Sequence, residues 1–208
     1  MPDQVTEETV DVKLLPRFQP ISYADAGPRA RQVYEELGRS SPDNAVLGTF
    51  MRNPDLTRVH SPFVAYMKNS TCLPVRHREI AILRSAWICG ADYQWEMHNQ
   101  IGLECGLTRD EIERIPSGAE SPQWTPEEAN VLRAVDELHS TCRVGDRTWA
   151  GLAGQYDEEQ LVEFLVLVGN YRTIAYLMNG VGIPPPSGVS PDLPGNRFLF
   201  SSPEATAP

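Results

Sequence analysis

Basic residues are scarce in this chain, and they never gather in a run. The 208 residues include 18 Lys and Arg against 28 Asp and Glu, so the net charge is -10 at neutral pH. A protein that binds nucleic acid normally carries a basic patch on one face. We therefore expect no nucleic-acid partner, and we attribute the acidity to solubility.

Long hydrophobic runs are also missing. No apolar run reaches the roughly 18 residues that a membrane-spanning helix needs. The N-terminal segment "MPDQVTEETVDVK" is acidic and lacks the apolar stretch of a signal peptide. These absences predict a cytoplasmic protein with no membrane partner.

The sequence lacks the spacings of a disulfide framework or a metal site. Its four cysteines share no C-x-x-C motif and are Cys72, Cys89, Cys105 and Cys142. In a reducing compartment they are expected to be free thiols. No H-x-x-x-H or H-E-x-x-H spacing, which would suggest zinc, occurs at His60, His77 or His139. We expect no metal.

Strand patterns are missing too, because β-branched residues never alternate with polar ones over a useful length. Helix starts are frequent instead. Thr125, Pro126 and Glu128 form a capping box with proline at the first helical position, and Thr108 and Asp146 are further candidate N-caps. The fold class is therefore all-α, with helices expected at residues 24–38, 52–69, 74–89, 92–106, 107–115, 125–143, 146–156 and 157–182.

Prolines mark the less regular parts of the chain. Pro62 falls inside the helix expected at residues 52–69 and should kink or split it. The last 25 residues hold seven of the 18 prolines. We therefore expect an N-terminal arm (1–24), one helical domain (25–185) and an extended tail (186–208). The apolar "FLF" of the tail should pack on its own subunit or on a neighbouring one.

Two ionisable residues interrupt the apolar faces of consecutive helices. At about 100° per residue, Glu79 falls between Leu83 and Ala86 on the apolar arc of the helix at residues 74–89. Gln94 and His98 fall inside the apolar arc of the next helix. A buried polar group is costly unless it has a partner, so each of these side chains needs one.

The same two helices should form an antiparallel hairpin, because only residues 90–92 join them. Measured along the first helix, Glu79 lies about 16 Å from the turn at Gly90, and measured along the second helix, His98 lies about 12 Å from it. These levels nearly match, so we expect Glu79 and His98 to meet directly or through one water. Such a pair can serve packing alone, or it can be an acid/base couple poised near neutral pH.

The segment "LPVRHREIAILRSAWICGADYQWEMHNQIGLECGLTRDEIERI" resembles the carboxymuconolactone decarboxylase family, which includes the AhpD-like alkylhydroperoxidases. The resemblance extends over roughly residues 25–185. It rests on the pattern L-P-x-R-x-R-E-x-A-I-L-R followed by G-A-x-Y-x-W-x-x-H. It implies an AhpD-like helical bundle, assembled as a homotrimer or homohexamer with the hairpin at the subunit interface.

In the peroxidase branch of that family, a Glu precedes a C-x-x-C motif, and a His follows four residues after the second Cys. Glu79 and His98 match the Glu and the His, whereas Ala91 and Gln94 occupy the two thiol positions. Peroxide reduction needs a peroxidatic and a resolving thiol. The resemblance therefore points to a non-peroxidase branch, with Cys89 two residues too early to substitute.

For a decarboxylase branch, the resemblance implies a small-molecule substrate and no cofactor. The substrate class would be a small cyclic acid or lactone that loses carbon dioxide and is then protonated. His98 is the candidate general acid, and Glu79 would orient or charge it.

Substrate-binding roles follow from the same comparison. Gln94 could hydrogen-bond a carbonyl or enolate, and Tyr93 and Trp95 could line a pocket, although packing explains Trp95 better. Arg84, like Arg78, flanks Glu79 and could hold a carboxylate. An ion pair with an acidic side chain explains such an arginine at least as well.

Three functions stay open at this point. The first is a cofactor-independent lyase or isomerase acting on a small organic acid or lactone. The second is a thiol peroxidase with unconventional cysteines, which the missing C-x-x-C disfavours. The third is a non-catalytic binding or assembly protein, for which a purely structural Glu79–His98 pair would suffice.

Overall fold

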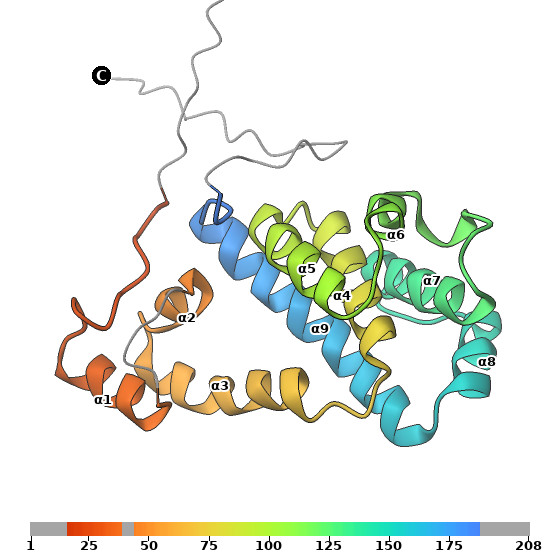
Figure 1. Ribbon diagram of the computed structural model, residues 1–208. Helices are drawn as coiled ribbons and strands as arrows, with labels where there is room; N and C mark the ends of the chain where they lie inside the picture. The colour runs from red at the N-terminus through yellow and green to blue at the C-terminus, as the bar shows by residue number, and fades with distance from the viewer. Residues whose placement is uncertain (1–15, 39–43, 188–208) are drawn as a thin grey trace, which may run out of the picture.

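The computed structural model describes residues 16–38 and 44–187, and every regular element within them is helical. The expected all-α fold is confirmed. The elements (Figure 1) are α1 (Pro28–Glu36), α2 (Ala45–Phe50), α3 (Pro54–Asn69), α4 (Val75–Ile88), α5 (Asp92–Glu104), α6 (Arg109–Arg114), the 3₁₀ helix η1 (Ile115–Glu120), α7 (Pro126–Thr141), α8 (Asp146–Gln155) and α9 (Glu158–Val181).

Most expected helix starts are confirmed, and one cap is corrected. Thr108 and Thr125 each form the capping box that their sequences predict. Asp146, in contrast, is the first residue of α8, and the N-cap position belongs to Gly145. An aspartate can stabilise a helix start either as the N-cap or, one position later, in the first turn through the helix dipole. The sequence alone does not separate these two positions.

The N-terminal half holds two differences from the expected helices. Helix α3 continues through Pro62 as one element. Helix α2 was not expected: its start is capped by the Asn44 side chain, which accepts hydrogen bonds from the backbone N–H groups of Val46 and Leu47 at 2.9 and 3.2 Å. Six residues are too short to show a periodic apolar pattern. The expected domain limits stay a prediction, and the "FLF" segment lies outside the described residues.

The core of the protein forms around α4, which packs against α5, α7 and α9 (Figure 1). Burial of its aliphatic face against these three helices supplies most of the hydrophobic stabilisation of the site region. The fully buried residues of this core include Ile80, Leu83, Leu132, Ile115 and Leu167. A separate small cluster, with Val33, Tyr34 and Met51, joins α1 to α2 and α3.

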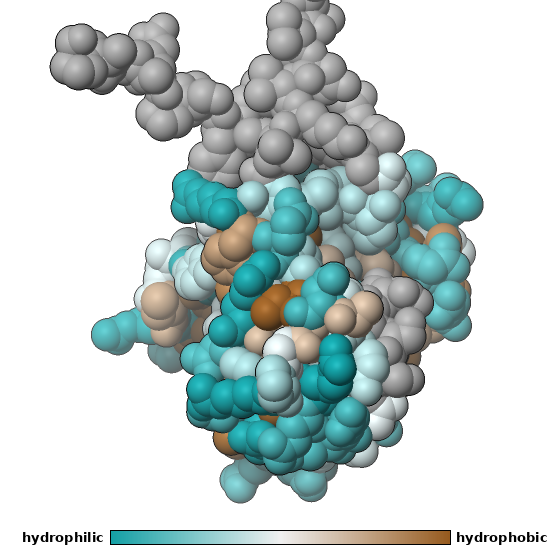
Figure 2. All heavy atoms as spheres, turned by 90° about the vertical axis from the view of Figure 1, so that its left-hand side faces the viewer, coloured by the Kyte–Doolittle hydropathy of each residue, from teal (hydrophilic) through white to brown (hydrophobic). Residues whose placement is uncertain are grey.

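The surface at the end of the molecule formed by α1 and α2 contains both hydrophilic and hydrophobic residues. Viewed from that side, Figure 2 shows a mostly hydrophilic surface with a small hydrophobic area near its centre. Larger exposed apolar side chains lie on α3 and α9 and include Val59, Val162, Val166 and Tyr176. The expected homotrimer or homohexamer, with the hairpin at the subunit interface, stays a prediction.

Helix α9 is the longest element and the most apolar. By length and composition alone it could cross a membrane, with a mean hydropathy of 1.3 over its best window. Half of that window is buried inside the protein. A core helix of a folded domain meets the same test, and α9 supplies Phe164 and Leu167 to the core.

Candidate active site

Glu79 and His98 form the pair that their positions predict. His98 Nδ1 lies 2.8 Å from Glu79 Oε2, and the two residues stand on α4 and α5, the arms of the hairpin. The Glu79 side chain is 1% exposed and the His98 side chain 13% exposed. The carboxylate is therefore sealed, and the imidazole keeps limited access to the surface.

The turn between α4 and α5 sets the level at which the pair meets. Gly90 adopts a positive φ of 56°, which costs little only for glycine. The N–H groups of Gly90 and Ala91 then donate to the carbonyls of Trp87 and Ala86 at 3.1 and 2.9 Å. This closure ends α4 and starts α5 at once, so the two helices run antiparallel at the expected register.

Arg78 completes the site as a third member. Its Nε atom donates to Glu79 Oε1 at 2.9 Å, and its Nη1 atom donates to the Lys68 carbonyl at the same distance. The Glu79 carboxylate is thus held from both sides, by an imidazole and by a guanidinium. Sequence position hides this contact, because adjacent helical residues do not normally share a face.

The electrostatic balance keeps Glu79 ionised. Burial raises the pKa of Glu79, but the His98 hydrogen bond and the charges of His98 and Arg78 outweigh it, so this pKa lies below its ordinary value. Tyr171 of α9 lies edge-on to the His98 ring, with centroids 5.0 Å apart. Burial raises the pKa of the Tyr171 phenol, and the charge of Glu79 adds to the effect, so the phenol stays neutral.

This arrangement leaves one atom of the imidazole for chemistry. Glu79 is an acceptor only, so the neutral His98 ring donates its Nδ1–H and carries a lone pair on Nε2. Within the described residues Nε2 makes no hydrogen bond. An imidazole held by a carboxylate at one nitrogen can accept a proton at the other, and return it, near neutral pH.

The other predicted substrate-binding residues are placed as follows. Gln94 is buried; its Nε2 donates to the Ile82 carbonyl at 3.4 Å, and its Oε1 is buried without a partner among the described residues. Tyr93 packs with Ile174 and Met178 in an apolar cluster beside α9. Trp95 lies in the main core. Gln94 is thus the member of this group with an unused polar atom.

Arg84 lies on another side of α4. It forms a two-pronged ion pair with Asp136 at 2.6 and 3.0 Å, and it donates to the carbonyls of Ile115 and Pro116 at 2.9 Å. These contacts join α4 to α7 and η1. They favour the ion-pair interpretation of Arg84 over carboxylate binding.

The two positions of the family's thiols hold no nucleophile. Ala91 is fully buried at the start of α5, and Gln94 lies one turn later. Cys89 Sγ lies 4.0 Å from His139 Nδ1 rather than near His98. Burial raises the pKa of the Cys89 thiol more than nearby Arg172 lowers it. A thiol held in its neutral form is a weak nucleophile.

The cavity that the structure describes lies elsewhere. It has a volume of about 210 Å³ and is lined by residues of α4, α7, α9 and the C-cap of α7, and neither Glu79 nor His98 is among them. The His98 side chain is 13% exposed, and it lies outside the lining of this cavity.

A second histidine, His60 of α3, contacts helix α9. His60 of α3 lies with its Nε2 3.1 Å from Asn170 Oδ1, and its ring stacks on Phe50 at 4.5 Å. Asn170 therefore ties α9 to α3. Among the described residues no group of three His, Cys, Asp or Glu side chains could hold a metal ion.

Comparisons with known proteins bear on the fold and on one segment of the chain. Residues 60–137 match the model of the carboxymuconolactone decarboxylase family. The search of curated proteins returned no match. The matched segment contains the whole hairpin, including Glu79 and His98.

Solved structures share the fold at low sequence identity. An uncharacterised peroxidase-related protein from Ralstonia eutropha JMP134, with an AhpD core, is 15% identical, covers 83% of this chain and 93% of its own, and has a TM-score of 0.66. The debrominase Bmp8, in complex with 2,3,4-tribromopyrrole, is 19% identical over 79% of this chain and 88% of its own, at 0.61. A protein of unknown function from Agrobacterium tumefaciens is 22% identical over 81% and 98%, at 0.58. Residues 60–137 are therefore similar to the carboxymuconolactone decarboxylase family, and the helices form a fold shared with AhpD-like structures.

Proposed function

We propose that the protein is a cofactor-independent lyase or isomerase that acts on a small cyclic organic acid or lactone. The observation that carries the proposal is the 2.8 Å contact between His98 Nδ1 and Glu79 Oε2, which leaves Nε2 as a proton donor and acceptor. In this proposal His98 is the catalytic acid, and Glu79 is a positioning residue that sets its tautomer and orientation.

The reaction would use a lactone that bears a β,γ-unsaturated carboxylate, with the double bond conjugated to the lactone carbonyl. The bond to the carboxylate breaks, carbon dioxide leaves, and the electron pair moves into a dienolate. Protonated His98 then delivers one proton from Nε2 to the γ carbon and regains it from solvent. One proton is consumed in each turnover, and no oxidant or metal is needed.

The surroundings of His98 fit such a step. The edge of the neutral Tyr171 ring and the Arg78 guanidinium bring hydrogen atoms and positive charge near the site. The unpartnered Gln94 Oε1 could accept a hydrogen bond. Of the similar structures, the debrominase holds a small planar ring compound. These features support the reaction class and leave the substrate itself to experiment.

The proposal predicts incorporation of solvent hydrogen into product. Incubation in D₂O with a panel of lactones bearing a β,γ-unsaturated carboxylate should give carbon dioxide and a product carrying one deuterium at the γ carbon, because His98 exchanges its proton with solvent. Mass spectrometry measures both. Products without deuterium would contradict proton delivery from an exchangeable group.

A thiol peroxidase is the alternative function, and it would reduce alkyl hydroperoxides with dithiol reductants. Because the thiol positions are Ala91 and Gln94, and because burial raises the pKa of the Cys89 thiol, we expect no steady turnover of an alkyl hydroperoxide with dithiol reductants. A coupled reductant assay measures this. Turnover abolished by Cys89→Ser, but unchanged in the matched variant Cys105→Ser, would favour the peroxidase.

A further inference from the structure

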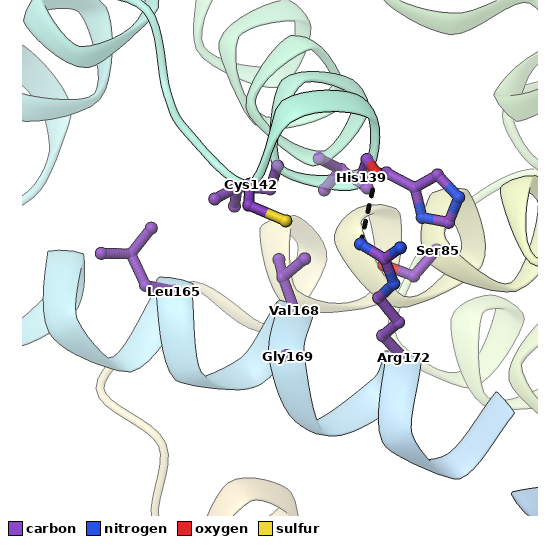
Figure 3. A pocket seen from close by; sticks show the side chains of 9 residues that line it. Ser85, His139, Cys142, Leu165, Val168, Gly169 and Arg172 are labelled. Atoms are coloured by element: carbon purple, nitrogen blue, oxygen red, sulfur yellow. Dashed lines mark hydrogen bonds between the residues drawn. The ribbon is translucent and has the colours of Figure 1, made fainter. Parts of the chain in front are cut away.

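The cavity between α4, α7 and α9 has the composition of a binding site. One wall is aliphatic and contains Leu138 of α7 with Leu165 and Val168 of α9. Arg172 lies at the other side, beside His139 and Ser85, and Cys142 lies above Val168 (Figure 3). Pockets for small molecules commonly combine an apolar lining with a few polar groups that fix orientation.

Arg172 is the charged group of this cavity. Its Nη1 donates to the His139 carbonyl at 3.2 Å (Figure 3). Its Nε donates to the Tyr176 hydroxyl. Among the described residues it forms no ion pair with a carboxylate. The acidic side chain nearby on α7, Asp136, is already paired with Arg84. A partly buried guanidinium beside apolar walls therefore keeps donors for an anion.

The histidine on the same wall does not supply a second positive charge. Burial lowers the pKa of His139, and the charge of Arg172 lowers it further. The cavity therefore presents one cation, which matches a ligand with a single negative charge.

Gly169 is one of the residues that line the cavity. It lies on the face of α9 between Leu165 and Arg172, one turn from each. A Cβ atom built at this position would meet no atom within 4 Å. Glycine inside a helix lowers stability relative to alanine, and here no steric contact requires it. A larger side chain at this position would therefore have open space beside the cavity lining.

We propose that this cavity binds a small monocarboxylate with an apolar body, its carboxylate on Arg172 and its carbon skeleton against Leu138, Leu165 and Val168. The site is separate from the Glu79–His98 pair and does not depend on the proposed lyase activity. The competing explanation is that Arg172 only caps the C-terminal end of α7, where its contact with the His139 carbonyl is favourable.

Benzoate and benzyl alcohol test the charge requirement in the unaltered protein. The two have similar size, and only benzoate carries a carboxylate. We expect benzoate to bind with a Kd of about 1 mM or below, and benzyl alcohol at least tenfold more weakly. Titration followed by nuclear magnetic resonance measures both. Equal binding of the two, or no benzoate binding at about 10 mM, would overturn the proposal.

Variants on α9 locate the binding site. Gly169→Leu should fill the cavity mouth and abolish benzoate binding, whereas Gly180→Leu should leave it unchanged, because Gly180 lies on the same helix, away from the cavity, and also has open space around its Cβ. Arg172→Met should weaken binding at least tenfold. Melting temperatures check that each variant is folded. Unchanged binding in Gly169→Leu would place the ligand elsewhere.

Cys142 offers a readout that does not use mutation of the site. It is the exposed cysteine of the four, and it lines the cavity. Bound benzoate should slow the alkylation of Cys142 by iodoacetamide. Benzyl alcohol at the same concentration should not. Mass spectrometry of the peptide that contains Cys142 measures the rate. Equal alkylation rates with and without benzoate would contradict occupancy of this cavity and favour the capping role of Arg172.

Discussion

Replacing His98 by glutamine should cut turnover of a true substrate by about 100-fold or more while leaving the fold nearly intact. Glutamine keeps a polar side chain of similar length, and it can still donate a hydrogen bond to Glu79. It cannot release or accept a proton near neutral pH. The loss should appear in kcat, because the proton is delivered during the chemical step, and steady-state kinetics of the purified variant measures it.

His77→Gln is the matched control for this prediction. His77 is also a partly buried histidine whose Nδ1 makes a hydrogen bond, at 2.7 Å to the Tyr156 hydroxyl. Its replacement should lower stability somewhat and leave kcat unchanged. If His98→Gln lowers the melting temperature while activity per folded molecule is retained, the Glu79–His98 pair serves packing, and the binding or assembly interpretation gains support.

Removing the Glu79 carboxylate should destabilise the protein strongly. In Glu79→Leu the Arg78 guanidinium, 8% exposed and bonded to Glu79 through Nε, loses its counter-charge. A buried charge left without its partner typically costs about 3–5 kcal/mol. Chemical denaturation measures the free energy of unfolding. The double variant Glu79→Leu with Arg78→Met should recover part of this loss, because both charges are then gone. A double variant no more stable than Glu79→Leu would contradict the assigned role of Arg78.

The same carboxylate should make stability depend on pH in the acid range. The folded-state pKa of Glu79 lies below its ordinary value, so its contribution is complete above the unfolded pKa of about 4.3 and is lost as the pH falls through the lower folded value. The stability difference between the unaltered protein and Glu79→Gln should therefore shrink with falling pH in that window. A difference that stays constant there would show that Glu79 ionisation is not linked to folding.

Local patterns in the sequence were sufficient for the helices and for the hairpin. The capping boxes at Thr108 and Thr125 each depend on residues three positions apart, so they can be read without knowing the fold. The level of the Glu79–His98 contact follows from helical rise and one short turn. Helix α2 was not predicted because six residues carry too little periodicity, and helix α3 continues through Pro62 as one element.

Side-chain partners across helices were decided by the tertiary structure. Asp136 is 52 residues from Arg84 and forms an ion pair with it, whereas the sequence had suggested Arg84 as a substrate-binding residue. Arg78 donates to the carboxylate beside it, and both residues are buried in the folded protein. The cavity beside Arg172 is formed by three helices that are distant in sequence.

By itself, the sequence determined the all-α fold, the hairpin and the contact between Glu79 and His98, since these follow from spacing within one or two helices. The third member of the pair's network, the fate of Arg84 and the place of the cavity required the packing of α4 against α7 and α9, because contacts between distant segments depend on how whole helices are oriented.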